Sequence, residues 1–198
     1  QVAYLEIENQ GLKDQALENQ RLKALLDFKD SSDFLLVPAK IIGWDLSSYA
    51  RTVKINVGFK EGIQKGQAVI SPKGLLGQII DEPGRLSGAH WAQVLLITDP
   101  TSRVSAVIER TRDRGIVEGI GDEKKLLVKY LSPESKPLPG DVVVTSGLGG
   151  IFPAGIKVAV IFKIELNPFS GSPQCWLKPA ADFERLEEAL VLKPEIKK

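Results

Sequence analysis

The sequence predicts a mainly β fold in which two small β-barrels follow one long N-terminal α-helix. Short apolar, β-branched runs recur at close spacing from Phe34 onward. Glycine, proline, asparagine, aspartate and serine separate these runs and leave no room for helices of ordinary length. Before them, residues 1–30 are dominated by residues that favour helices and contain no proline. Barrels are favoured over open sheets because closure removes exposed strand edges.

The first expected element is a helical coiled-coil stalk over residues 1–30. Leucine or asparagine recurs every seven residues along one face, as the seam of a coiled coil requires. We expect two chains to pair in parallel through this seam, which predicts a homodimer. The alternative is an amphipathic helix that packs on its own domain. The predicted seam residues are Leu5, Leu12, Asn19, Leu22 and Leu26.

The strand-rich remainder divides into two barrels, because a turn-like segment near residue 100 lies between two groups of runs. We assign residues 34–108 to the first barrel and residues 109–193 to the second, with a closing C-terminal strand, and expect 194–198 to be a loose tail. Residues 182–189 alone look helical in this region. The expected strands are 35–42, 52–57, 67–70, 75–80, 93–98, 103–108, 115–120, 125–130, 142–145, 156–164 and 190–192.

A glycine-dense connection between two apolar runs, in the segment DVVVTSGLGGIFPAGIKVAVI (141–161), is the most informative motif. A phosphate-binding loop would need a lysine where Ile156 stands, and a dinucleotide loop would need a glycine where Phe152 stands. We therefore expect a structural turn without a bound cofactor. The turn residues are Thr145, Ser146, Gly147, Leu148, Gly149, Gly150, Phe152, Pro153 and Gly155.

The motif resembles the signature of the MreC family of rod shape-determining proteins. Other blocks follow in the family order before and after the turn, so the resemblance covers nearly the whole chain beyond the predicted stalk. Ala159 departs from the family pattern, in which glycine is common at this position. The remaining matching blocks are Asn56-Val57-Gly58, Glu61-Gly62-Ile63, Gly66, Val69-Ile70, Gly74 to Ile79, Leu96 to Asp99, Gly140-Asp141, Pro179, Phe183, Leu186 and Val191-Leu192.

The resemblance implies a scaffold of the cell-wall elongation machinery (the elongasome) that helps determine cell shape by organising enzymes of peptidoglycan synthesis. It implies an anchor in the bacterial inner membrane, β domains in the periplasm, and the elongation penicillin-binding protein and MreD as partners. We expect aromatic side chains to mark the partner surface, because aromatic residues often dominate binding energy. The candidates are Tyr49, Trp91 and Phe152.

Composition limits the other function classes. Lysine and arginine total 26 against 25 aspartates and glutamates, which gives no electrostatic basis for binding nucleic acid. No apolar run reaches the length that spans a bilayer, about 18 residues or more. The chain begins with Gln1 and contains no methionine, so we expect it to be part of a longer protein whose anchor lies upstream.

Catalysis is not expected. A chymotrypsin-like peptidase needs a histidine base, and His90 is the only histidine available to a nucleophile such as Ser146. Cys175 is the only cysteine, and no spacing of ligands indicates a metal site. A periplasmic adaptor of an efflux or secretion system remains an alternative, although such adaptors insert a helical hairpin within a β module, whereas here the predicted helix precedes all strands.

Overall fold

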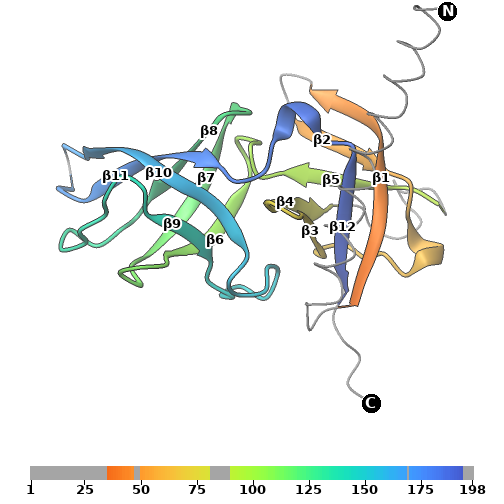
Figure 1. The fold of residues 1–198 in the computed structure, drawn as a ribbon, viewed down its shortest axis with the longest axis horizontal. Helices are drawn as coiled ribbons and strands as arrows, with labels where there is room; N and C mark the ends of the chain where they lie inside the picture. The colour runs from red at the N-terminus through yellow and green to blue at the C-terminus, as the bar shows by residue number, and fades with distance from the viewer. Residues whose placement is uncertain (1–34, 47–49, 81–89, 169, 194–198) are drawn as a thin grey trace, which may run out of the picture. The chain divides into compact units, whose positions relative to one another are not determined.

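The computed structural model describes residues 35–46, 50–80, 90–168 and 170–193, and the strands in this part of the chain form two closed six-stranded barrels (Figure 1). Residues 36–193, which contain both barrels, form one compact unit. The strands are β1 (Leu35–Leu46), β2 (Arg51–Ile55), β3 (Ala68–Ser71), β4 (Gly74–Ile79), β5 (Ala92–Leu96), β6 (Arg103–Ile108), β7 (Arg114–Asp122), β8 (Lys125–Lys129), β9 (Val142–Thr145), β10 (Lys157–Leu166), β11 (Pro173–Pro179) and β12 (Glu188–Lys193).

The first barrel has the strand order β1-β12-β3-β4-β5-β2, and the second has the order β10-β11-β8-β7-β6-β9. The strands are therefore not divided between the barrels at residue 108, as the sequence predicted. β6 belongs to the second barrel, and β12 closes the first barrel instead of the second. The chain passes between the barrels twice, once between β5 and β6 and again between β11 and β12.

Alternating side chains fill the barrel interiors, as the two-residue period of a strand requires. In β5, Ala92, Val94 and Leu96 are buried, whereas the residues between them are partly exposed. In β11, Cys175 and Leu177 are buried in the same alternating pattern. β-Bulges in β1 and β10 let these long strands bend around their barrels.

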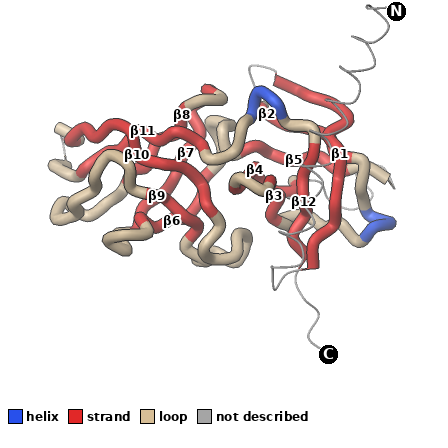
Figure 2. Tube along the Cα trace, in the orientation of Figure 1, coloured by secondary structure: helices blue, strands red, loops and turns tan. Residues whose placement is uncertain are grey.

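The predicted fold class is wrong in its helical component. The described residues contain no α-helix and only two 3-10 turns, η1 (Phe59–Glu61) and η2 (Phe183–Arg185). Figure 2 marks their positions in blue. The predicted stalk and its seam lie outside the described residues, so the fold class is corrected to two closed barrels. Composition and a seven-residue spacing supported the helix, and local propensity of this kind is a weak guide. Residues 182–189 likewise form η2 and then the start of β12, because Ala189 is buried in a barrel strand.

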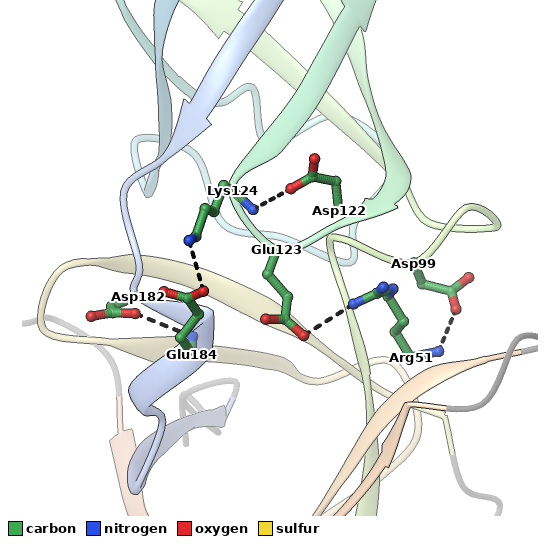
Figure 3. A network of polar contacts seen from close by, with 7 residues as sticks. All are labelled: Arg51, Asp99, Asp122, Glu123, Lys124, Asp182 and Glu184. Carbon is green, nitrogen blue, oxygen red and sulfur yellow. Dashed lines mark hydrogen bonds and ion pairs between the residues drawn. The ribbon is translucent and has the colours of Figure 1, made fainter.

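Close backbone approach joins the two barrels. The Gly121 amide donates to the carbonyl of Thr98, and an added Cβ at Gly119 would lie 2.0 Å from the carbonyl oxygen of Asp99. Side chains extend this junction, since Arg51 forms an ion pair with Glu123 at 3.1 Å while its amide donates to Asp99 at 2.6 Å (Figure 3). Glycine at position 119 therefore allows β7 to touch the chain that leaves β5.

Candidate interaction surface

The turn between β9 and β10 is held by the side chain of Thr145 at its base. The Thr145 hydroxyl donates to the carbonyl of Pro153 and accepts from the Ile156 amide at 2.9 Å. The backbone adds further bonds, because the Gly155 amide donates to the Thr145 carbonyl and the Thr145 amide donates to the Ile156 carbonyl. One β-branched polar residue thus ties both ends of the turn together.

Ser146 fastens the same turn to β6. Its amide donates to the carbonyl of Ser105 at 3.0 Å, and its hydroxyl donates to the Ser105 hydroxyl at 2.8 Å. The Ser146 hydroxyl also accepts from the Leu148 amide at 3.1 Å, which shapes the first residues of the turn. The serine is therefore used within the turn and its neighbouring strand.

Left-handed backbone at four glycines completes the turn. Gly147, Gly149, Gly150 and Gly155 have φ angles of 79°, 89°, 73° and 87°. Residues with a Cβ adopt this region only at a cost of about 1–2 kcal/mol, so glycine permits the path that the chain follows here. The conformation of the turn is therefore determined by the backbone preferences of its glycines as well as by the hydrogen bonds at its base.

This turn presents apolar side chains to solvent. Leu148 is 52% exposed and Ile151 is 42% exposed, whereas Phe152 is only 6% exposed. Phe152 was a predicted partner contact, and the structure places its ring inside while its neighbours point outward. Sequence reasoning singled out the aromatic residue and missed the two aliphatic ones. The available signal was that both residues directly follow a glycine of the turn.

The other predicted surface residues lie elsewhere. Tyr49 and the seam residues Leu5, Leu12, Asn19, Leu22 and Leu26 are outside the described residues. Trp91 precedes β5 in the first barrel, where the Lys54 ammonium lies 4.8 Å from the centre of its ring. This distance is typical of a cation–π contact, which accounts for a partly exposed tryptophan at that position. The structure does not bring Trp91 and Phe152 together in one described contact.

His90, the candidate base, has its own partners. Its Nδ1 lies 3.3 Å from Glu61 Oε1, and its Nε2 lies 3.3 Å from Lys60 Nζ. Glu61 also accepts from the Gly58 amide, and this bond is the main reason why the pKa of Glu61 is below its ordinary value, with His90 as a further cause. A Ser146–His90 pair is thus not among the described contacts, and the peptidase alternative gains no support.

Within the described ranges, no three histidine, cysteine, aspartate or glutamate side chains converge as metal ligands. No helix found there has both the length and the apolar character needed to cross a membrane.

A pair of charged side chains braces the segment that enters β9. Asp141 accepts two hydrogen bonds from Arg110, and these bonds, more than any other contact, hold the pKa of the aspartate below its ordinary value. Asp141 in turn contributes, behind burial, to the raised pKa of Cys175, which is about 11. The two residues are 31 positions apart along the chain, so local sequence patterns do not indicate this pair.

Comparison with known proteins agrees with this architecture. A family model described as "Rod shape-determining protein MreC, barrel core" matches residues 41–193. The cell shape-determining protein MreC of Listeria monocytogenes is 37% identical over 198 residues, which cover 98% of this chain and 64% of that protein. The chain therefore spans less than two thirds of the length of this relative.

Solved structures resemble the chain as well. One MreC structure has a TM-score of 0.81 at 28% identity and covers 90% of this chain and 99% of its own. A complex between penicillin-binding protein PBP2 and MreC from Helicobacter pylori has a TM-score of 0.60 at 22% identity, covering 82% of this chain and all of the matched one. At that identity the likeness concerns the fold alone. From the family model and the relative that is 37% identical, we conclude that this chain belongs to the MreC family of rod shape-determining proteins.

Proposed function

We propose that this chain is the partner-binding part of a non-catalytic scaffold for bacterial cell-wall elongation. Family membership supports a role in cell shape, and the complex from Helicobacter pylori is evidence that one MreC protein binds a penicillin-binding protein. By this proposal the chain acts in the periplasm, is linked to the inner membrane by an upstream anchor, and associates with a second copy of itself and with MreD. No cofactor enters the proposed role.

The observation that carries the proposal is the preformed apolar turn between β9 and β10. Leu148 and Ile151 are exposed on a backbone that is already fixed by Thr145 and Ser146. A contact surface that is fixed before binding loses little conformational entropy when a partner arrives, so more of its contact energy remains as affinity. Such a surface suits a scaffold, whose task is to hold an enzyme without altering a substrate.

The test is binding of the purified chain to the periplasmic part of the elongation penicillin-binding protein from the same organism. We expect Leu148→Glu combined with Ile151→Glu to weaken binding by about tenfold or more, since two apolar contacts are lost and two charges are introduced. Leu166→Glu is the matched control, because Leu166 is an exposed leucine outside the turn. Equal affinity of all three proteins would contradict the role of the turn, and no binding by the unmodified chain would contradict the scaffold proposal.

A further inference from the structure

A groove of about 570 Å³ lies where the second chain crossing meets both barrels. Its walls come from the β3–β4 turn of the first barrel, from the β7–β8 turn, β10 and the end of β11 in the second, and from the connection that contains η2. Figure 3 shows part of this wall, where Lys124 and Glu184 meet. The volume falls in the range of ligand sites, about 300–1,000 Å³.

Apolar side chains and cations line different parts of this groove. Phe162 is 47% exposed, and the buried residues Pro179 and Phe183 form the apolar wall beside it. Lys73 and Lys178 are exposed lysines on the same lining. An occupant that places an apolar side chain near Phe162 would therefore have ammonium groups around it.

The acidic residues of the lining are already engaged. Glu123 pairs with Arg51 at 3.1 Å, and Glu184 pairs with Lys124 at 2.9 Å. The Asp182 carboxylate accepts from the Glu184 amide at 3.1 Å, which caps η2. No carboxylate of the described residues pairs with Lys73 or Lys178. The ammonium groups of Lys73 and Lys178 are therefore available to an external anion.

We propose that this groove binds an acidic peptide segment that carries one aromatic or large aliphatic side chain. The apolar lining fits such a side chain, and Lys73 and Lys178 match flanking carboxylates. A highly hydroxylated glycan would leave this apolar surface unused, and a membrane would need a wider exposed face than a groove. The inference goes beyond the scaffold role, because the groove and the β9–β10 turn consist of different residues.

The probe is a fluorescein-labelled short peptide with glutamates on both sides of a central phenylalanine, titrated into the purified chain at low salt. We expect Lys73→Glu combined with Lys178→Glu to weaken binding by about tenfold, because two attractions become repulsions. Lys40→Glu combined with Lys136→Glu is the matched control, since both lysines are exposed and outside the lining. We expect the peptide affinity of this control to stay within about twofold of the parent's. A change of that size measures the long-range effect of the altered net charge.

Two further arms test the apolar half of the proposal. Phe162→Ala should lower the affinity for the phenylalanine peptide by several fold. The affinity for a peptide with glycine in place of phenylalanine should not change. The proposal is overturned if the lysine reversal and its control behave alike, or if the glycine peptide binds the parent as well as the phenylalanine peptide does. It is also overturned if the parent does not bind the phenylalanine peptide, or binds vesicles containing phosphatidylglycerol instead of the peptide. Thermal unfolding of each variant confirms that it is folded, and none of these arms requires a penicillin-binding protein.

Discussion

Arg110 and Asp141 are joined by two parallel hydrogen bonds, Nε to Oδ1 at 2.7 Å and Nη2 to Oδ2 at 2.8 Å. Asp141 also accepts from the Leu138 amide, and Arg110 donates to the carbonyl of Lys136. The pair thereby attaches the segment before β9 to the β6–β7 turn. Only 8% of Asp141 is exposed, so these donors, in place of water, stabilise its negative charge.

Asp141→Asn should lower the free energy of unfolding at neutral pH by about 1–3 kcal/mol, since a charged acceptor in a buried site is lost. The pKa of Asp141 is lowered in the folded state, so its contribution is complete above the unfolded pKa, ordinarily about 3.9, and disappears as pH falls through the folded value. Urea unfolding of parent and variant as a function of pH measures this. If the difference in unfolding free energy between parent and variant stayed constant down to acidic pH, the stabilising role of the Asp141 charge would be contradicted.

Gly119→Ala should destabilise the chain by more than about 3 kcal/mol, because its Cβ would lie 2.0 Å from the Asp99 carbonyl oxygen. Gly149→Ala is the matched control: its added Cβ meets nothing within 4 Å, so only the positive φ is costly, at about 1–2 kcal/mol. Thermal and urea unfolding compare the two. Similar losses would show that close approach at the junction is not what requires Gly119.

Asp99→Ala should destabilise the junction by about 1–3 kcal/mol, because a buried acceptor is removed from the amides of Arg51 and Thr101. Asp99→Asn retains one carbonyl acceptor and should cost less. Urea unfolding gives the free energies, and amide hydrogen exchange at Arg51 and Thr101 reports the lost bonds directly. If alanine and asparagine cost the same, the hydrogen bonds at Asp99 contribute little.

Cys175 should resist thiol reagents in the native protein and react only as fast as the chain opens, since burial raises its pKa to about 11. The unfolded thiol ionises at about 8.5, so stability should fall as pH rises from there towards the folded value. Cys175→Ala is the control, and its alkaline loss of stability should be smaller. Rapid labelling of the folded parent would be inconsistent with a buried thiol.

Most strands were predictable because their own residues carry the signal. β6 and β9 have the predicted limits, since β-branched runs between turn residues decide them locally. The limits of β11 were not predicted, because Pro173 and Pro179 stand at its ends and its pairing with β8 and β10 comes from distant residues. The barrel to which β12 belongs could not be predicted for the same reason, because nothing in Glu188–Lys193 indicates which barrel this strand closes.

The candidate surface was only partly predictable. The glycines of the β9–β10 turn mark a special backbone path, and the four positive φ angles fit that interpretation. Which side chains leave this path for solvent depends on packing, so Phe152 could not be separated from Ile151 by sequence reasoning. Lys73 and Lys178 meet at one groove through the barrel topology, and their distance along the chain hides this.

The closure of the first barrel by β12 has a consequence for synthesis on the ribosome. β1 and β3 are the neighbours of β12, so both keep an open edge until the last strand has been made. The strands β6 to β11 are contiguous, and the barrel they form can close earlier. Of the two barrels, the one whose synthesis begins first is thus completed last, and a nascent chain stalled before β12 would present chaperones and proteases with one finished barrel and one barrel that lacks its closing strand.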